Sequence, residues 1–334
     1  MGKYKPKLGF TETEVGIKLI KDCFERKLAK KLSLLRVTAP KFLVVGTGLQ
    51  DDLAGTQEPI GFHTKFIERK VEIVHSLAKW KRHTLWKRGF PVGKGIYTDM
   101  DAIRKDELAD EIHSIYVDQW DWELMIGKGD RTLGFLKNVV RKIYSAMIET
   151  EREVARKFPH LKARLPREIR FIHSEALAKK YPGLTSAERE TKIAKKFGAV
   201  FIVGIGHELF DGKPHDLRAA DYDGWSTLTS EGRGLNGDII VWDKTRARPL
   251  ELSSMGIRVD ADALKYQLGK SGSMERTSLP FHSGVLSGKI PPTIGGGIGQ
   301  SRLCQLLLHK AHIGEVQSSI WPDEIHDSFG EAIL

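Results

Sequence analysis

The sequence predicts an α+β protein in which a mixed, mainly antiparallel sheet is flanked by helices. Strand-like and helix-like segments alternate along the 334 residues. The strand-like segments, however, occur in hairpin-like pairs, such as 94–100 with 113–123 and 237–243 with 249–259. Such pairs are typical of antiparallel sheets, whereas parallel strands need long crossover connections. No repeat, low-complexity segment or linker interrupts the chain, so we expect a single domain over residues 1–334.

The helices and strands are expected in the following order. Thr11-Glu12-Thr13-Glu14 has the pattern of a capping box and opens a long amphipathic helix, and Thr185-Ser186-Ala187-Glu188 is a second capping box. Leu34 to Val45 is expected as a strand, and Pro40 confines it to an edge or an interface, because proline cannot donate to a strand ladder. Hydrophobic patterns predict further strands at 66–75, 94–100, 113–123, 168–173, 199–203, 237–243 and 249–259, and helices at 76–88, 130–158, 185–196, 260–270 and 300–311.

Composition excludes several classes of protein. Hydrophobic residues make up 40% of the chain and charged residues 29%, as in ordinary soluble proteins. No apolar run approaches the roughly 18 residues of a membrane span, and the N-terminus lacks the apolar stretch of a secretory signal. The two cysteines, Cys23 and Cys304, are expected as buried thiols in a reducing compartment. We therefore expect a cytoplasmic protein that does not interact with a membrane.

The formal net charge of +10 favours anionic ligands such as nucleotides or nucleic acid. The basic residues are scattered, with only short clusters such as those in 79–82 and 87–88. This distribution favours a solvated basic surface over a dedicated nucleic-acid groove.

The most informative motif lies near the C-terminus and reads Gly295-Gly296-Gly297-Ile298-Gly299-Gln300-Ser301-Arg302. Glycines let a backbone lie flat against a purine ring, where a Cβ would collide. Arg302, in the first turn of the following helix, would supply a planar cation for a phosphate or a base. An ordinary glycine turn before a helix is the alternative, and this segment alone leaves both interpretations open.

A second motif spans residues 104–123. Arg104 ends one predicted strand and is followed at once by an acidic pair. In the next strand, alternation separates two faces, with Gln119, Asp121 and Glu123 on one and Asp118, Trp120 and Trp122 on the other. The exposed face of an edge strand would explain this alternation, but it would not explain the aspartate on the tryptophan face.

A third motif pairs two carboxylates on neighbouring predicted strands. Asp238 opens one strand and Glu251 lies in the next. Such a pair is well placed to hold Mg²⁺, which prefers a few carboxylates together with phosphate oxygens. Because Arg258 lies an odd number of residues from Glu251, both face one pocket only if a bulge occurs, and we expect it near Gly256.

Three further segments carry less information. The acidic loop Gln50–Gly55, which contains Asp51, is by itself most simply a plain turn. The helix at 76–88, with Ser76 at its start and Lys81 in its first turns, is by itself a basic surface helix. A loop after residue 204 favours a solvated surface over a metal site, because no helical spacing fixes its acidic and histidine residues, which are His207, Glu208, Asp211, His215 and Asp216.

Together these segments resemble the catalytic core of class II aminoacyl-tRNA synthetases. Residues 34–40 resemble the first signature motif, whose proline lies at a dimer interface. Residues 104–107 resemble the second, whose arginine grips the α-phosphate, although Asp106 stands where glutamate is usual. Gly297 to Arg302 resembles the third, whose arginine stacks on adenine near the γ-phosphate. The string Glu-Leu-Ser-Ser at 251–254 resembles the Glu-Ile-Ser-Ser of aspartyl and asparaginyl enzymes.

A closer resemblance, from about residue 11 to Trp321, is to ammonia-dependent aspartate–ammonia ligases, the A-type asparagine synthetases. Their hallmark strings occur here at 75–82, 116–123, 235–238, 251–260 and 293–303. One loop of that family usually reads Thr-Gln-Asp-Asn-Leu-Ser-Gly, where this chain has Leu49-Gln50-Asp51-Asp52-Leu53-Ala54-Gly55. Asp51 keeps its place, but the neighbouring hydroxyl groups are absent.

The resemblance implies a reaction in two steps. Aspartate and ATP would give β-aspartyl-AMP and pyrophosphate, and ammonia would then give asparagine and AMP. The catalytic residues implied are Asp51, Arg104 and Arg302. The ATP-binding residues implied are Arg104, Asp238, Glu251, Ser253, Gly297, Gly299 and Arg302, with Mg²⁺ held by Asp238 and Glu251. The substrate-binding residues implied are Ser76, Lys81, Gln119, Asp121, Ser254 and Arg258.

The resemblance leaves open which carboxylate meets the substrate amino group and which meets ammonia. It implies a homodimer that uses no tRNA. A tRNA-charging synthetase carries an anticodon-binding barrel before its core, and here the first motif begins within the first forty residues. A glutamine-dependent synthetase needs an N-terminal cysteine, and residue 2 is Gly2. The retained arginines and carboxylates argue against a catalytically silent relative.

Overall fold

The computed structural model describes residues 4–53 and 57–334. Its centre is an eight-stranded sheet with the order β1-β5-β6-β13-β12-β11-β8-β7. Only the outermost pairs, β1 with β5 and β7 with β8, are parallel. The predicted mixed, mainly antiparallel sheet is therefore confirmed. The strands are β1 Leu34–Arg36, β5 Gly95–Ile103, β6 Tyr116–Met125, β7 Arg170–His173, β8 Ala199–Val203, β11 Asn236–Asp243, β12 Arg248–Ile257 and β13 Thr293–Gly299.

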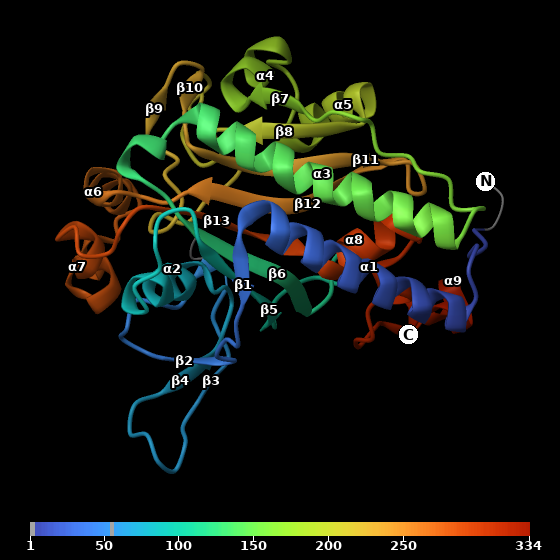
Figure 1. Ribbon diagram of the computed structural model, residues 1–334, viewed down its shortest axis with the longest axis horizontal. Coiled ribbons are helices and arrows are strands. Elements are labelled where there is room, and N and C mark those ends of the chain that lie inside the picture. Colours follow the sequence, from blue (N-terminus) through green and yellow to red (C-terminus); the bar gives the residue numbers. More distant parts are fainter. Residues whose placement is uncertain (1–3, 54–56) are drawn as a thin grey trace.

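Two small sheets accompany the main one. Strands β2 (Phe42–Val44), β3 (Gly61–Phe62) and β4 (Val71–Ile73) form an arm that projects from the body, at the bottom of Figure 1. Strands β9 (Leu228–Thr229) and β10 (Gly232–Arg233) form a short hairpin.

The single strand expected over 34–45 is wrong in extent. It divides into β1 and β2, which belong to different sheets and have Pro40 between them. The edge position expected from Pro40 is confirmed for β1. Of the strand expected at 66–75, only β4 forms.

Helices cover the sheet, and α1 and α3 lie side by side across one of its faces (Figure 1). The capping box at Thr185 is confirmed, but the one at Thr11 is wrong. Helix α1 begins earlier, with Gly9 as its N-cap, and Glu12 accepts a hydrogen bond from the Gly9 N–H at 3.2 Å. The helices are α1 Phe10–Leu32, α2 Ala78–Lys87, α3 Leu133–Lys157, α4 Ser174–Lys180, α5 Ser186–Phe197, α6 Ala261–Lys270, α7 Pro280–Leu286, α8 Gln300–Leu307 and α9 Asp323–Phe329.

The two faces of β6 have the separation expected from its alternation. Trp120 and Trp122 are fully buried, and the Trp120 ring lies 4.7 Å from that of Phe24 on α1. Asp118 of β6 lies next to the N-terminus of α8. It accepts hydrogen bonds from the N–H and hydroxyl of Ser301, at 3.0 and 2.8 Å. A carboxylate at a helix N-terminus satisfies otherwise unpaired N–H groups, which explains the aspartate on the tryptophan face.

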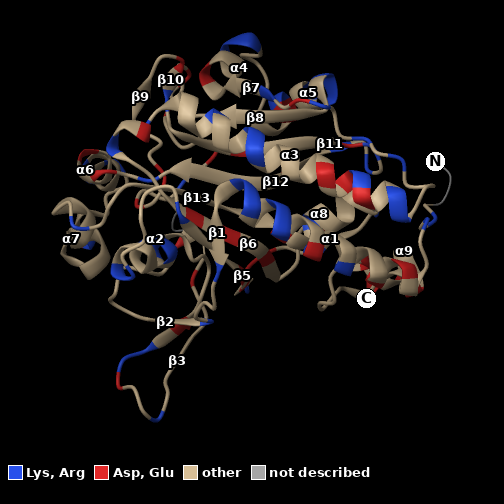
Figure 2. Cartoon of the chain, viewed as in Figure 1, with Lys and Arg blue, Asp and Glu red and all other residues tan. Residues whose placement is uncertain are grey.

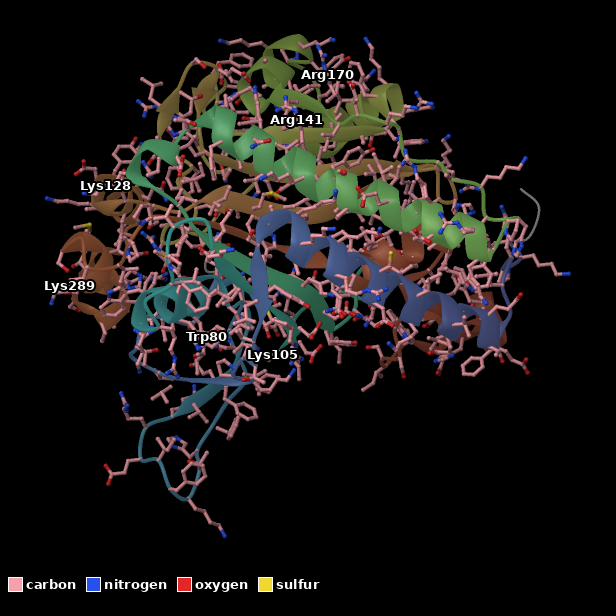
Figure 3. All side chains as sticks on the ribbon, in the orientation of Figure 1. Trp80, Lys105, Lys128, Arg141, Arg170 and Lys289 are labelled. Carbon is pink, nitrogen blue, oxygen red and sulfur yellow. The ribbon has the colours of Figure 1, made fainter. Side chains whose placement is uncertain are left out.

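Charged residues of both signs are interspersed over the fold (Figure 2). Of the basic side chains labelled in Figure 3, Lys128 and Lys289 lie on one side of the molecule, Arg141 and Arg170 lie near each other at the top, and Lys105 lies below. Within the described ranges, none of the helices combines the length and apolar character of a membrane span.

Candidate active site

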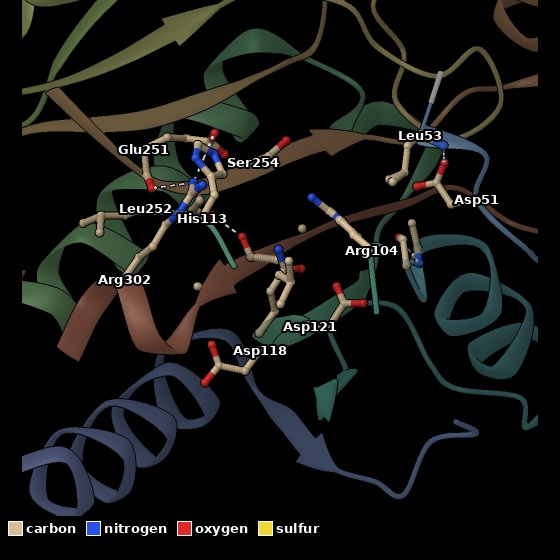
Figure 4. Close-up of a pocket in the computed structure, with 18 of the residues that line it drawn as sticks. Asp51, Leu53, Arg104, His113, Asp118, Asp121, Glu251, Leu252, Ser254 and Arg302 are labelled. Carbon is tan, nitrogen blue, oxygen red and sulfur yellow. Dashed lines mark hydrogen bonds and ion pairs between the residues drawn. The ribbon is translucent and has the colours of Figure 1, made fainter. Parts of the chain in front are cut away.

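A cleft of about 420 Å³ opens where β6, β12 and β13 meet the loop at 216–223. Because Trp120 faces α1, its neighbours Gln119 and Asp121 project from the opposite face of the sheet, into this cleft. Most of the predicted site residues line it (Figure 4), namely Asp51, Ser76, Arg104, Gln119, Asp121, Glu251, Ser253, Ser254, Arg258, Gly297, Gly299 and Arg302. Lys81 and Asp238 do not line the cleft but contact residues that do.

The glycine-rich segment is a strand and not a turn. As β13 it lies between β6 and β12, with Gly297 opposite Asp121 and Ser254. A Cβ on Gly297 would collide with the side-chain oxygen of Gln119, and one on Gly295 would collide with Glu123. The glycines therefore leave room for side chains of the neighbouring strands that form the cleft.

Two arginines reach the cleft from different elements. Arg302, in the first turn of α8 as expected, donates to the carbonyl of Glu251 at 3.1 Å and lies 3.5 Å from its carboxylate. Arg104 follows β5, and its buried Nε has no hydrogen-bond partner among residues 4–53 and 57–334. In the view of Figure 4, Arg302 and Glu251 lie at one end of the cleft, Asp51 lies at the other, and Arg104 lies between them.

The carboxylates of Asp238 and Glu251 share one face of the sheet. Residue Ile240 pairs with Glu251, and Ile239 pairs with Ser253, so Leu252 is the extra residue of a bulge. The bulge expected near Gly256 therefore occurs four residues earlier, and it brings Glu251 and Arg258 to the same face.

Asp238 has an unusual electrostatic environment. Burial, together with the nearby charge of Glu251, raises the pKa of Asp238 to about 7, although Arg218 acts in the opposite direction. Arg218 donates to Asp238 at 2.7 Å and to the Ser254 hydroxyl at 2.6 Å. Two like charges at this position favour a cation between them.

Arg258 is held by two buried acids. Its guanidinium donates to Glu123 at 2.7 Å and to Asp223 at 2.6 Å, and all three side chains are at most 2% exposed. Burial acts to raise the pKa of Glu123, but Arg258 outweighs it and holds this pKa below its ordinary value. Arg258 is therefore a fixed cation in the wall of the cleft.

Lys81 does not line the cleft, and like Arg258 it is a buried cation paired with an acid. It is fully buried, forms an ion pair with Asp121 and donates to the Gly296 carbonyl at 3.3 Å. Burial lowers the pKa of Lys81, although Asp121 opposes this effect. The ammonium group thus orients Asp121, whose own pKa is raised by burial against the influence of Lys81.

Asp51 lies in the segment that joins β2 to β3 of the arm, and it is only 2% exposed. Its carboxylate accepts a hydrogen bond from the Leu53 N–H at 3.0 Å. Burial raises the pKa of Asp51, and the nearby Lys79 lowers it only in part. The loop is therefore more than the plain turn expected from its sequence, although residues 54 and 55 of the predicted loop lie outside the described residues.

Comparison with known proteins decides the family. The model of the aspartate–ammonia ligase family matches residues 11–332. The aspartate–ammonia ligase of Parabacteroides distasonis is 54% identical over 96% of this chain and 94% of its own length. That of Clostridium perfringens is also 54% identical, with the same coverage. The chain belongs to the aspartate–ammonia ligase family. It is therefore a carbon–nitrogen ligase.

Solved structures share the fold of this ligase at low identity. Asparaginyl-tRNA synthetase from Pyrococcus horikoshii, complexed with asparaginyl-adenylate, matches with a TM-score of 0.67 and 14% identity, over 93% of this chain and 70% of its own. Asparaginyl-tRNA synthetase from Entamoeba histolytica, also with asparaginyl-adenylate, matches with a TM-score of 0.63, over 92% of this chain and 66% of its own. The ligase thus has a class II aminoacyl-tRNA synthetase fold.

One wall of the ligase's cleft was not predicted from the sequence. The loop expected to be solvated is exposed at Glu208, Asp211 and Asp216, but His215 is buried and Asp216 also borders the cleft. Arg218 and Asp223, which follow that loop, line the cleft as well. No local motif marks these positions. Arg218 and Asp223 acquire their roles only through contacts with β11 and β12, which are distant in sequence.

Proposed function

We propose that this ligase makes L-asparagine from L-aspartate and ammonia through a β-aspartyl-AMP intermediate, releasing pyrophosphate and then AMP. Membership of the aspartate–ammonia ligase family supports the overall reaction. One observation supports the intermediate above others: Arg302 with Glu251, then Arg104, then Asp51 follow one another along a single cleft (Figure 4). That order suits a nucleotide at one end and an incoming amine at the other.

The activation step needs charge neutralisation more than acid–base catalysis. A carboxylate is a poor electrophile, and adenylation gives it a good leaving group. The two arginines would hold the nucleotide, with Arg104 at the α-phosphate and Arg302 at the adenine and γ-phosphate end. The buried Nε of Arg104, which has no hydrogen-bond partner among the described residues, supports this role, because a phosphate oxygen would satisfy it.

The acidic pair suits Mg²⁺. Asp238 and Glu251 lie on one face of adjacent strands, and their mutual repulsion contributes to the raised pKa of Asp238. A hard divalent cation with oxygen ligands would relieve that repulsion, and phosphate oxygens of ATP would complete its shell. When bound, Mg²⁺ would supply neutralisation of the phosphate charges.

The aspartate substrate would occupy the centre of the cleft. Gln119, Asp121 and Ser76 would orient it, including its ammonium group. Arg258, which follows β12 directly, would receive a carboxylate through N–H groups not used by its buried acids, and Ser254 on β12 would assist. Lys81 would not contact the substrate directly but would orient Asp121 through their ion pair.

Asp51 would serve the second step. At neutral pH ammonia is present mostly as the ammonium ion, and only neutral ammonia is a nucleophile. A buried carboxylate with a raised pKa attracts an ammonium ion and is a stronger base than an exposed one. We therefore propose that Asp51 binds the incoming ammonium and accepts its proton.

We also propose that the ligase is a cytoplasmic homodimer that acts without tRNA. Phe42 and Phe62 on the projecting arm contact edge to face, with ring centroids 5.2 Å apart, and both remain exposed. Exposed aromatic pairs are typical of surfaces that a partner covers. Light scattering should give the mass of a dimer, and a stable active monomer would contradict it.

The proposed reaction is tested by an assay of AMP release with purified protein, ATP, Mg²⁺ and no tRNA. Release is expected only when aspartate and an ammonium salt are both present, with one asparagine formed for each AMP. Release of ADP in place of AMP, or a requirement for tRNA, would contradict the proposal.

A further inference from the structure

The loop that carries Asp51 is held from both sides. On the N-terminal side, Gln50 donates to the Ile73 carbonyl at 2.8 Å and accepts from the His75 N–H at 3.1 Å. On the C-terminal side, Asp52 forms an ion pair with Arg276 in the short 3-10 helix Met274–Ser278. The catalytic candidate thus sits between two anchored neighbours.

The conformation of this loop needs such anchors. Leu53 has a φ of 50°, in the left-handed region that residues with a Cβ avoid. Such a conformation costs about 1–3 kcal/mol and persists only where surrounding contacts impose it. The Leu53 N–H bonds the Asp51 carboxylate, so the strained turn and the orientation of Asp51 depend on each other.

Arg276 is itself held in place by a second carboxylate. It lies 3.4 Å from Asp221, a fully buried carboxylate that also bonds Lys79 at 2.6 Å and His282 at 2.9 Å. Burial acts to raise the pKa of Asp221, but Lys79 and His282 outweigh it and hold this pKa well below its ordinary value. Asp221 is therefore ionised and supplies a permanent anchor for Arg276.

One carboxylate oxygen of Asp52 pairs with Arg276. Its second carboxylate oxygen is buried without a hydrogen-bond partner in the part of the chain that the structure describes. Residues 49–55 carry no side-chain hydroxyl group. The ion pair to the distant 3-10 helix is therefore a contact that this loop does not make with hydroxyl groups of its own.

We propose that the Asp52–Arg276 ion pair fastens the loop that carries Asp51 and positions Asp51 for the ammonia-dependent step, without acting in the activation of aspartate. Arg276 is a positioning residue in this role, because it contacts Asp52 and Asp221 and does not itself line the cleft. The inference rests on the proposed function.

Measuring pyrophosphate exchange and asparagine formation separately distinguishes a role in positioning Asp51 from a general structural role. Exchange of labelled pyrophosphate into ATP requires aspartate but no ammonia, whereas asparagine formation requires both. Arg276→Ala should raise the KM for ammonium about tenfold and leave the exchange rate within about twofold of the starting protein. Asp52→Ala should give the same pattern, and the double variant should be no worse than Arg276→Ala, because that variant already removes the contact with Asp52.

Conservative and distant variants complete the design. Arg276→Lys keeps the charge and should restore the ammonium KM to within about threefold. Arg156→Ala removes an exposed arginine that pairs with Glu153 on α3 and should change neither reaction. Thermal melting checks that each variant is folded.

The outcomes distinguish the two proposals. An unchanged ammonium KM in folded Arg276→Ala, or an equal loss of exchange and asparagine formation, would overturn the positioning role. Absence of aspartate-dependent exchange in the unaltered protein would instead overturn the adenylate pathway itself.

Discussion

Arg302 contacts Glu251 through both the backbone carbonyl and the carboxylate of that residue. It thereby joins α8 to β12 at the proposed nucleotide end of the cleft. Arg302→Ala should lower AMP formation about a thousandfold, because a fixed cation at the phosphates is lost. Circular dichroism should show an intact fold, since Arg302 lies at the edge of the core. Near-normal turnover would refute the role, and Arg156→Ala is the matched control.

Asp51 is the residue for which the two half-reactions should diverge. Asp51→Asn keeps the size of the side chain but removes its charge and its ability to accept a proton. Asparagine formation should fall about a hundredfold, while pyrophosphate exchange should fall by less than about tenfold. Parallel rate measurements of both reactions check this ratio, and equal losses would refute the ammonia role.

Strand β13 shows how an element without side chains shapes the cleft. Gly297→Ala would introduce a Cβ against the end of the Gln119 side chain, which is able to swing away. We expect the kcat/KM for aspartate to fall about tenfold, with a loss of stability below about 1.5 kcal/mol.

The chain offers two comparisons for this glycine. Gly129→Ala adds a Cβ in open space and should be silent. Gly237→Ala meets the backbone carbonyl of Ile202, which cannot move aside, and should instead reduce stability. Steady-state kinetics and thermal melting of the three variants separate the effects, and a Gly297→Ala variant with unchanged kinetics would contradict this view of β13.

Capping and alternation patterns predicted helix starts and strand faces correctly where contacts between residues close in sequence determine them. Thr185 caps its helix as expected, and β6 separates its two faces as expected. The Thr11 box failed because Gly9 begins the helix two residues earlier. The segment 295–299 was ambiguous because glycine has no side-chain pattern, and its strand conformation is imposed by pairing with β6 and β12.

Site residues that belong to a local sequence motif were predictable, whereas those that depend on contacts between distant segments were not. Arg104, Glu251 and Arg302 belong to recognisable strings, and all three line the cleft. Arg218 and Asp221 lie in a loop without a motif. Their importance arises from partners at positions 238 and 276, which only the folded chain brings near.

At the scale of the whole molecule, the buried triad Glu123–Arg258–Asp223 links β6, β12 and the 216–223 loop. Arg258→Met would leave two buried carboxylates without their cation and should lower the free energy of unfolding by about 3–5 kcal/mol at neutral pH. Thermal or urea melting measures this loss. A loss as small as that of Arg156→Ala would contradict the structural role.

The pH dependence of this loss has a defined sign. The pKa of Glu123 is lowered in the folded protein, so its stabilising contribution is present above its unfolded pKa and is lost as the pH falls through the folded one. Without Arg258, burial would raise this pKa instead. The stability deficit of Arg258→Met should therefore be largest at neutral pH and shrink toward about pH 4. A deficit that stays constant or grows on acidification would contradict this account.

The central claim is that aspartate is activated as an acyl-adenylate, and oxygen transfer tests it most directly. Aspartate labelled with ¹⁸O in its β-carboxylate is converted to asparagine, and the phosphorus-containing products are examined by mass spectrometry. Attack of that carboxylate on the α-phosphate predicts one labelled oxygen in AMP and none in pyrophosphate. Label in inorganic phosphate or pyrophosphate, with unlabelled AMP, would show activation at another phosphate and contradict the account.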